Sequence, residues 1–333
     1  MPVDVEARTP SVPVGRATGT RHVPGQPLLI GLVNNMPDTA LHATETQFQG
    51  LLQAAAGGRE IRLRLSSFPE LPRCGEARER VERCYWALDE LLAAPLDALI
   101  VTGTEPRASR LTDEPYWQRS VELLAFAEQH TAASVWSCLA AHSAVLHLDG
   151  IERRRLPEKR CGVYEHSILA GHPLLEGVSA PMRMPHSRWN ELSADELRAA
   201  GYTLLSWSAE AGADAFVRQE RSLLLFFQGH PEYEDLTLLK EYRRDVGRYL
   251  RGEQPHYPSL PCGYLSAEAV ARLGAFREQA LAERSVGLLE KFPFGSVAAE
   301  LQNTWRPAAV AIYRNWLSFI AAARTPSRTA ETV

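Results

Sequence analysis

The sequence predicts an α/β fold: a doubly wound, mostly parallel sheet flanked by helices in the flavodoxin-like manner, with a helical C-terminal extension. Short apolar runs alternate with helical segments along the chain, which is the pattern of parallel sheets. Several of these runs are apolar on both faces, as buried parallel strands are. Reactive side chains follow three of the runs, at the strand ends where such sheets bind ligands.

Four segments of the first half are predicted to be strands of this sheet. "PLLIGLVNN" is a short apolar run that ends in polar residues, and "LDALIVTGT" is a buried run that leads into a glycine turn. "IRLRLSSF" alternates, and "ASVWSC" brings a cysteine to the end of its strand. In chain order, these strands cover residues 27–35, 61–68, 96–104 and 133–138.

Helical segments follow these strands. The first is expected to be capped by Thr44 or Thr46 and to end at Gly57-Gly58, because hydroxyl side chains favour helix starts and glycine favours helix ends. The helices predicted in the first half cover residues 43–58, 78–94, 117–131 and 139–150.

The second half continues the alternation and then becomes helical. "YTLLSWS", "DAFVRQE" and the very apolar "SLLLFFQGH" are predicted strands, and a charged amphipathic helix follows from about Leu236 to Leu250. Residues 264–300 are predicted to be a helical insertion, and "TWRPAAVAIYRNWLSFIAAA" an amphipathic helix that carries Trp305 and Trp316.

Composition divides the chain into four parts. The first is rich in proline, glycine, threonine and arginine and has no periodicity, so we expect a flexible arm. The parts are an N-terminal arm (1–26), the α/β domain (27–262), a helical insertion with a C-terminal helix that packs on the core (263–324), and a disordered tail (325–333).

The charge and cysteine content exclude several classes of protein. The 333 residues carry 36 basic and 40 acidic side chains, a net charge of −4, without the clustered basic residues of nucleic-acid-binding proteins. No run of about 18 apolar residues predicts a membrane span, and the first residues lack the apolar core of a secretory signal. The five cysteines are widely spread, so neither a disulfide framework nor a zinc site is expected. We therefore expect a cytoplasmic protein without nucleic-acid or membrane partners.

Cys138 lies in "SVWSCLAAHSAV", at the junction of a predicted strand and a predicted helix. The amide groups and the dipole of a helix N-terminus favour a thiolate, which is the nucleophilic form of cysteine. Alone, the pattern is more typical of a buried structural thiol, because free cysteine is among the most buried residue types. Partners at other strand ends therefore decide between the two interpretations.

His230 and Glu232, in "GHPEYE", follow the most apolar strand. Residues two apart on an extended segment share one side, so Glu232 can orient the imidazole of His230, which can accept the proton of Cys138. We predict that these three residues are catalytic. The alternatives are an ordinary loop with a capping acid, and a metal site with His186. The spacing of that metal site matches no zinc motif, so no metal is expected.

A nucleophile of this kind is commonly accompanied by an oxyanion hole, which needs two preorganised backbone donors. The amide of Leu139, directly after the cysteine, is one candidate. The glycine turn at Gly103 and Thr104 is predicted to supply the other.

Many segments, in order, resemble the homoserine O-succinyltransferases and O-acetyltransferases, a family built on the class I glutamine amidotransferase fold. The resemblance covers roughly residues 28–262 and 303–317. It rests on "IGLVNNMP", "TETQF", "DALIVTGTEP", "LTDEPYW", "VWSCLAAHSAVLHLDGI", "LPEKRCGVYEH", "HPLLEGV", "MPHSRWNEL", "GHPEYEDLTLLKEYRRDV" and "NTWRP…YRNWL".

The resemblance implies a ping-pong acyl transfer from acyl-CoA to the hydroxyl of homoserine, in methionine biosynthesis. Cys138 would carry the acyl group, His230 would act as general base and acid, and Glu232 would orient it. Acyl-CoA would be a co-substrate, with no bound cofactor, and the family implies a homodimer. Substrate-binding roles are implied for Lys159, Ser187 and Arg244.

The sequence departs from the family pattern at several points. Leu139 replaces an aromatic residue after the cysteine, and His142 replaces a glutamine. Arg107 lies near the position that separates acetyl from succinyl users, and its charge would attract the free carboxylate of a succinyl group, so succinyl-CoA is favoured. Serine or another hydroxy amino acid remains an alternative acceptor. A glutaminase, which uses the same fold and triad, is the alternative activity.

Overall fold

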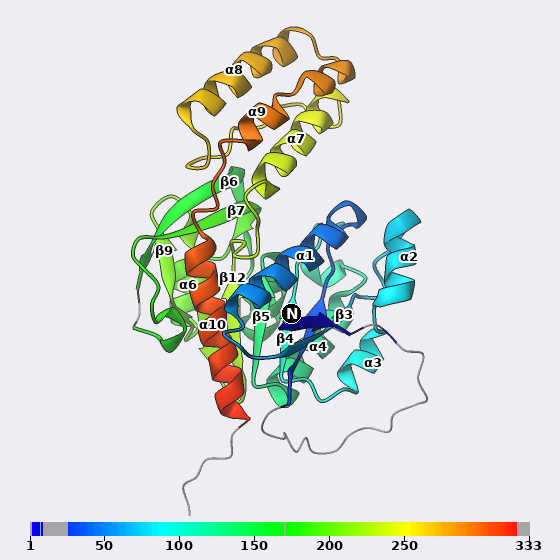
Figure 1. The fold of residues 1–333 in the computed structure, drawn as a ribbon, viewed down its shortest axis with the longest axis vertical. Coiled ribbons are helices and arrows are strands. Elements are labelled where there is room, and N and C mark those ends of the chain that lie inside the picture. The colour runs from blue at the N-terminus through cyan, green and yellow to red at the C-terminus, as the bar shows by residue number, and fades with distance from the viewer. Residues whose placement is uncertain (1, 7, 9–25, 170, 325–333) are drawn as a thin grey trace, which may run out of the picture.

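The computed structural model describes residues 2–6, 8, 26–169 and 171–324. Their main layer is a sheet in the order β1-β3-β2-β4-β5-β12-β11-β8 (Figure 1). Pairing is parallel from β1 to β12 and antiparallel for the last two pairs, which confirms the predicted mostly parallel sheet. Its strands are Val3–Val5 (β1), Leu28–Val33 (β2), Ile61–Ser66 (β3), Ala98–Val101 (β4), Ala133–Ser137 (β5), Thr203–Leu204 (β8), Ala215–Gln219 (β11) and Leu223–Phe227 (β12).

Helices cover both faces of this sheet, and alternate strand residues form the two cores. Ile100, Val135 and Leu225 pack in the core under α1 (Asp38–Ala55) and α10 (Arg306–Ala323). The neighbouring strand residues Leu99, Trp136 and Leu224 pack on the opposite face. The helices of that face are Leu88–Leu92 (α3), Trp117–His130 (α4), Leu139–Asp149 (α5) and Ala194–Ala199 (α6). This is the doubly wound arrangement.

A second, antiparallel sheet has the order β10-β9-β6-β7. Its main part is a long hairpin of β6 (Arg154–Ile168) and β7 (Met182–Glu191), joined at its edge by β9 (Ser206–Ser208) and β10 (Gly212–Ala213). The β6–β7 hairpin was not among the predicted elements. It reaches the main sheet at Pro185, whose carbonyl accepts a 2.8 Å hydrogen bond from the His230 amide.

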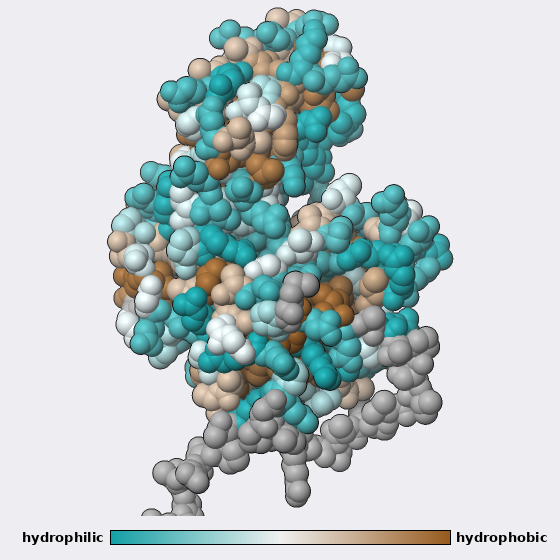
Figure 2. All heavy atoms as spheres, in the orientation of Figure 1, coloured by the Kyte–Doolittle hydropathy of each residue, from teal (hydrophilic) through white to brown (hydrophobic). Residues whose placement is uncertain are grey.

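The predicted helical insertion forms a lobe with α7 (Thr237–Leu250), the charged helix predicted before it. Figure 1 shows α7, α8 (Ala267–Ala282) and α9 (Phe294–Ala298) projecting together from the rest of the molecule. Their shared core has its own aromatic and aliphatic side chains, separate from the cores of the sheet. In Figure 2 the visible surface of the lobe is mixed, with apolar patches among hydrophilic residues. The remaining elements are α2 (Gly75–Cys84) and 3₁₀ turns at Leu111–Asp113, Pro173–Leu175 and Val286–Lys291.

Two predicted helix boundaries are wrong. The helix predicted from Thr44 or Thr46 begins at Asp38, directly after Pro37. The side-chain amide of Asn34 donates to the Leu41 carbonyl in its first turn at 2.8 Å. The helix predicted over 78–94 is broken into α2 and α3. The break occurs because the Trp86 amide donates to the carbonyl of Leu65 on β3 at 2.8 Å, which extends the backbone there.

Two further differences concern strands. The strand predicted at 202–208 divides at Leu205 between the two sheets, because the Leu205 amide turns to the Ala215 carbonyl. The arm predicted to be flexible over 1–26 contains β1, which pairs in parallel with β3. Residues 9–25 of that arm and the tail 325–333 lie outside the described residues.

None of the helices in the described parts of the chain has both the length and the apolar character needed to cross a membrane.

Trp316 on α10 allows a test of how the helix anchors the fold. Its side chain is fully buried and lies 5.8 Å from the ring of Tyr313. We expect Trp316→Ala to lower the free energy of unfolding by about 3–5 kcal/mol, because it leaves a large cavity under the sheet. Chemical denaturation followed by circular dichroism measures this. Arg314→Ala, on the exposed side of the same helix, is the control and should change stability by less than about 0.5 kcal/mol. A loss below about 1 kcal/mol for Trp316→Ala would contradict the packing described.

Candidate active site

The strand ends that carry the predicted reactive residues meet at one edge of the main sheet. Val101 on β4 is in register with Trp136 on β5, and Ser137 on β5 is in register with Phe227 on β12. The segments that leave these three strands therefore start side by side. They carry Gly103 and Thr104, then Cys138, then His230 and Glu232.

Cys138 occupies a sharp turn between β5 and α5. Its backbone has φ 53° and ψ −112°, and among the described residues it is the one non-glycine residue with positive φ. Such a conformation costs about 1–3 kcal/mol and persists only where the surroundings hold it. Here the Cys138 amide donates to the Phe227 carbonyl of β12 at 2.8 Å, and its carbonyl accepts from the His142 amide at 3.2 Å. The turn leaves the thiol half-buried.

His230 and Glu232 form a buried pair. The distance between His230 Nδ1 and Glu232 Oε1 is 2.9 Å. The ring of Tyr233 stacks on the imidazole at a centroid distance of 4.3 Å, and the Tyr233 hydroxyl donates to Glu241 at 2.7 Å. The indole of Trp305 donates to the Tyr233 carbonyl at 2.8 Å, so the C-terminal segment supports this stack.

The electrostatics of the pair favour a protonated imidazole. Burial opposes the charge of His230, but the charge of Glu232 and the hydrogen bond with Cys138 outweigh it. The pKa of His230 is raised well above its ordinary value as a result. Cys138 is among the groups that raise this pKa, so its side chain lies near the imidazole. The backbone pairing agrees, because the Cys138 amide donates to the Phe227 carbonyl, three residues before His230. The structure therefore brings the three predicted residues to the same place.

Gly103 lies directly against the residue after the cysteine. A Cβ atom at Gly103 would be 2.8 Å from the Leu139 nitrogen and 2.9 Å from the Leu139 Cβ, which leaves no room for a side chain. The Thr102 hydroxyl stabilises this turn. It donates to the Gly103 carbonyl at 3.0 Å and accepts from the backbone amide of Asn35 at 2.8 Å. The structure brings the two predicted donor segments together.

Lys159, Ser187 and Arg244 converge on two carboxylates of α7. Lys159 Nζ lies 2.7 Å from Asp245 and 3.9 Å from Glu241, and the hydroxyl of Ser187 donates to Glu241. Arg244 lies 3.0 Å from Asp245, with its side chain nearly half exposed. Burial opposes the charge of Lys159, but Glu241 and Asp245 outweigh it and raise its pKa.

Arg107 lies apart from this cluster, on the exposed loop after β4. Its backbone amide, with that of Ala108, donates to the buried Glu114 at 2.7 and 2.8 Å. These bonds fix the loop and leave the Arg107 side chain in solvent.

Sequence reasoning missed several residues of this site. Arg188 is buried, and its guanidinium donates to the carbonyls of Asn190 and Ala211. Burial lowers the pKa of Arg188 to about 10. The charge of Cys138 is among the influences that raise this pKa and so partly oppose the effect of burial. Tyr233, Glu241 and Asp245 were also missed. A hint was available, because all three lie in the quoted segment "GHPEYEDLTLLKEYRRDV".

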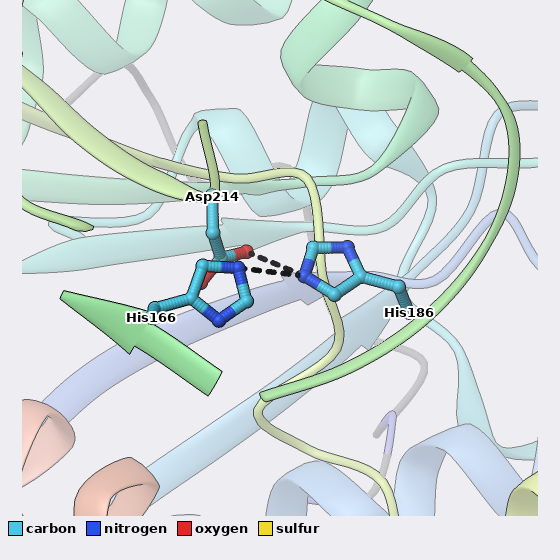
Figure 3. Close-up of side chains that lie close together, drawn as sticks. All are labelled: His166, His186 and Asp214. Carbon is cyan, nitrogen blue, oxygen red and sulfur yellow. Dashed lines mark hydrogen bonds and ion pairs between the residues drawn. The ribbon is translucent and has the colours of Figure 1, made fainter. Parts of the chain in front are cut away.

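A buried cluster of His166, His186 and Asp214 lies behind His230, and its three side chains could surround a metal ion. Figure 3 shows both dashed lines ending on the same nitrogen of His186. This Nε2 is 3.3 Å from His166 Nε2 and 3.8 Å from Asp214. Arg188 Nε donates to His186 Nδ1 at 3.2 Å, so the proton of His186 is on Nε2, which then has no lone pair for a metal. His166 Nδ1 in turn donates to the Tyr164 carbonyl at 3.1 Å.

Hydrogen bonds therefore fix both imidazoles of this cluster, whereas Asp214 Oδ2 is buried with no hydrogen-bond partner among the described residues. Burial lowers the pKa of His186 well below its ordinary value and raises that of Asp214. Asp214 accepts the Gly229 amide at 2.7 Å, and a Cβ at Gly229 would lie 2.8 Å from the same carboxylate oxygen. The cluster thus fixes the backbone that leads into His230. The metal site considered from the sequence, with His230 and Glu232, is a different combination.

The sequence profile of a family described as homoserine O-succinyltransferase matches residues 9–327. The chain belongs to this family. A homoserine O-succinyltransferase of Rhodopseudomonas palustris is 46% identical over 292 residues, 88% of this chain and 88% of the relative. Another, of Methylorubrum extorquens, is 46% identical over 293 residues, 88% of this chain and 87% of that one. The predicted family and acyltransferase class are thereby confirmed.

Among solved structures, a glutamine amidotransferase from Thermotoga maritima aligns with a TM-score of 0.50 at 10% identity, over 89% of this chain and 99% of that one. This likeness confirms the amidotransferase-like fold that was predicted for the chain.

His142, which departs from the family pattern, allows a test by pH. It is fully buried beside Gln228, at 3.2 Å, and burial lowers its pKa to about 3. The folded protein keeps His142 neutral, whereas the unfolded chain binds a proton below about pH 6.5, so stability falls as the pH drops from 6.5 towards 3. We expect His142→Gln to reduce the slope of unfolding free energy against pH by about one proton, or about 1.4 kcal/mol per pH unit.

Denaturant titrations between pH 7.5 and 4.5 measure this slope. His130→Gln, on the surface at the end of α4, is the matched control and should leave it unchanged. Parallel stability curves for His142→Gln and the unaltered protein would contradict the description of a neutral, buried His142.

Proposed function

We propose that this protein transfers a succinyl group from succinyl-CoA to the hydroxyl of homoserine, through a thioester on Cys138. The observation that carries the proposal is the geometry at one edge of the sheet. The turn at Cys138, with φ 53°, is bonded to Phe227 at the end of β12, and three residues further along His230 lies 2.9 Å from Glu232. Nucleophile, base and orienting carboxylate are the groups that covalent acyl transfer needs. Membership of the family supports the choice of acceptor and donor.

In the first half-reaction, the sulfur of Cys138 attacks the thioester carbonyl of the acyl-CoA. His230 has taken the thiol proton, and the tetrahedral intermediate collapses as the C–S bond to CoA breaks. The protonated His230 then gives its proton to the leaving CoA thiolate. Glu232 holds Nδ1 of the ring and stabilises the imidazolium between these two events.

In the second half-reaction, the hydroxyl oxygen of homoserine attacks the acyl-cysteine. His230 removes the hydroxyl proton and returns it to the sulfur of Cys138 as the C–S bond breaks. Both half-reactions form a negatively charged oxygen. The Leu139 amide and the turn at Gly103 and Thr104, in contact with Leu139, are the proposed donors to it.

The cluster on α7 suits an amino-acid acceptor, which carries both an ammonium and a carboxylate. Arg244 keeps donors exposed beside its ion pair with Asp245, and we propose that they bind the α-carboxylate. Glu241 and Asp245 are acidic partners suited to the ammonium group, held in place by Lys159 and Ser187. Serine, shorter by one methylene, is the alternative acceptor.

Covalent labelling tests the proposed intermediate. After mixing with succinyl-CoA and no acceptor, we expect the intact protein to gain the mass of one succinyl group, located on the peptide that contains Cys138. Cys138→Ala should gain none, and Cys84→Ala, at the end of α2 and outside the proposed site, should be labelled like the unaltered protein. An acyl group on another residue, or none with any donor, would contradict the ping-pong scheme.

Steady-state assays of CoA release then separate the alternatives. Succinyl-CoA and acetyl-CoA are each combined with homoserine and with serine, and glutamine is tested for ammonia release. Succinyl-CoA with homoserine is expected to give the highest kcat/KM. Release of ammonia from glutamine without transfer from any acyl-CoA would favour a glutaminase instead. A homodimer and a cytoplasmic location remain predictions.

The contact of Gly103 with Leu139 provides a test of the oxyanion site. We expect Gly103→Ala to lower kcat by about 10²–10³ with a smaller change in KM, because its Cβ would displace the Leu139 amide. Gly274→Ala on α8, where φ is ordinary and nothing lies within 4 Å of the added Cβ, controls for the loss of a glycine. Unchanged kcat in correctly folded Gly103→Ala would place the oxyanion donors elsewhere.

A further inference from the structure

A separate hollow lies next to the proposed active site and takes no part in the mechanism above. It has a volume of about 390 Å³. Its walls come from the loop after β4 (Pro106 and residues 108–112), from Leu146 on α5, and from the segment 152–155 with Asn190 on β7. Because α5 begins after Cys138, one wall of the hollow belongs to the helix that carries the nucleophile turn.

The charged groups of this hollow are mostly positive. Arg110, Arg153 and Arg155 line it, against a single carboxylate, that of Glu152. Among the described residues, none of these three arginines forms an ion pair. Three guanidinium groups around one concave surface are suited to bind a carboxylate or a phosphate.

Of the three arginines, Arg153 has the buried donor that lacks a hydrogen-bond partner within the described part of the protein. Its Nη1 is buried and has no hydrogen-bond partner. A buried N–H of a charged group costs free energy when it has no acceptor. An anion in the hollow would supply that acceptor. Arg155 is held differently, with its guanidinium 4.4 Å from the centre of the Trp189 ring, which fixes the plane of the group at the rim.

Arg153 also lies within electrostatic reach of the nucleophile. Burial lowers its pKa, and the charges of Tyr116, Glu114 and Cys138 act in the opposite direction. The loop that lines the hollow begins with the turn at Gly103, which lies against Leu139, the residue after Cys138. An acyl donor with its thioester at the sulfur can therefore extend along this loop into the hollow. The hollow is lined by Pro106 and Ala108, whereas the side chain of the intervening Arg107 is exposed outside it.

We propose that this hollow is an anion subsite for the acyl donor, with Arg153 as its main contact and Arg110 and Arg155 as supporting charges. The bound group is a carboxylate or phosphate, which can come from the free end of a succinyl chain or from the phosphates of CoA. The proposal rests on the proposed function, because it assigns a part of the same substrate. Under this proposal Arg153, and not Arg107 as expected from the sequence, recognises the acyl donor.

Four donors distinguish the sources: succinyl-CoA, acetyl-CoA, succinyl-pantetheine and acetyl-pantetheine. The variant is Arg153→Gln, which keeps much of the side-chain volume and removes the charge. If the subsite binds the succinyl carboxylate, kcat/KM falls about ten- to hundredfold for the two succinyl donors and stays unchanged for the two acetyl donors. If it binds a CoA phosphate, the loss affects both CoA donors and neither pantetheine donor.

Two results would overturn the proposal. One is no change with any donor. The other is an equal loss with all four, which would mean that Arg153 only supports the loop through the nearby Glu114. Arg154→Gln is the matched control, because Arg154 is exposed, lies 2.9 Å from Glu196 and does not line the hollow. It should leave all four values unchanged.

Binding in the Cys138→Ala background separates this proposal from the mechanism. Isothermal titration with succinyl-CoA and with acetyl-CoA measures Kd without turnover, before and after Arg153→Gln. A weakening of about tenfold or more for at least one donor supports the subsite even if acyl transfer follows another route. Equal Kd values with and without Arg153 would overturn the subsite while leaving the acyl-cysteine scheme intact.

Discussion

The left-handed backbone at Cys138 is the constraint on which the rest of the site depends. It exists because β5 pairs in parallel with both β4 and β12, so that the Cys138 amide meets the Phe227 carbonyl as the chain turns into α5. The same pairing sets Gly103 against Leu139 and brings the segment of His230 to the sulfur. A strained residue persists only when its surroundings hold it. Here those surroundings are also the proposed partners of the thiol.

A buried polar network supports this edge from the second sheet. Arg188 donates to His186, His186 contacts His166 and Asp214, and Asp214 accepts the amide of Gly229. Each member is buried, and most of its polar atoms are partnered within the network, although Asp214 Oδ2 has no hydrogen-bond partner among the described residues. Its effect is to hold the backbone before His230 between β7 and the main sheet. The antiparallel hairpin therefore helps to position His230, the proposed base.

The helical lobe has a related role through α7. One side of this helix presents Glu241, Arg244 and Asp245 to Lys159 and Ser187, and the other side packs into the core of the lobe through Tyr242, Val246 and Tyr249. The insertion after α7 thus gives a charged helix an apolar partner that the sheet does not provide. The proposed acceptor cluster and the arginine-lined hollow lie on different elements, α7 in one case and the loop after β4 in the other.

Much of the main sheet and of the proposed site could be predicted, because both depend on local patterns of residues. Apolar runs define β2, β4, β5 and β12, and reactive residues directly after them identify Cys138, His230 and Glu232 as neighbours, since parallel strands end together. Long-range contacts were not predictable in this way. The break at Trp86 depends on a hydrogen bond to Leu65, and the β6–β7 hairpin has no simple alternation of polar and apolar residues.

The sheet and the order of the residues proposed to react follow from the sequence alone, because periodicity and strand-end position are properties of neighbouring residues. The family follows from the resemblance of many segments in order. The charges that surround the proposed residues became visible only in the folded chain. Arg188 and Arg153 are ordinary arginines in the sequence. They become significant because the fold buries Arg188 and partly buries Arg153, and the charge of Cys138 acts on both. Burial and electrostatic reach arise from distances between segments, and no local pattern encodes them.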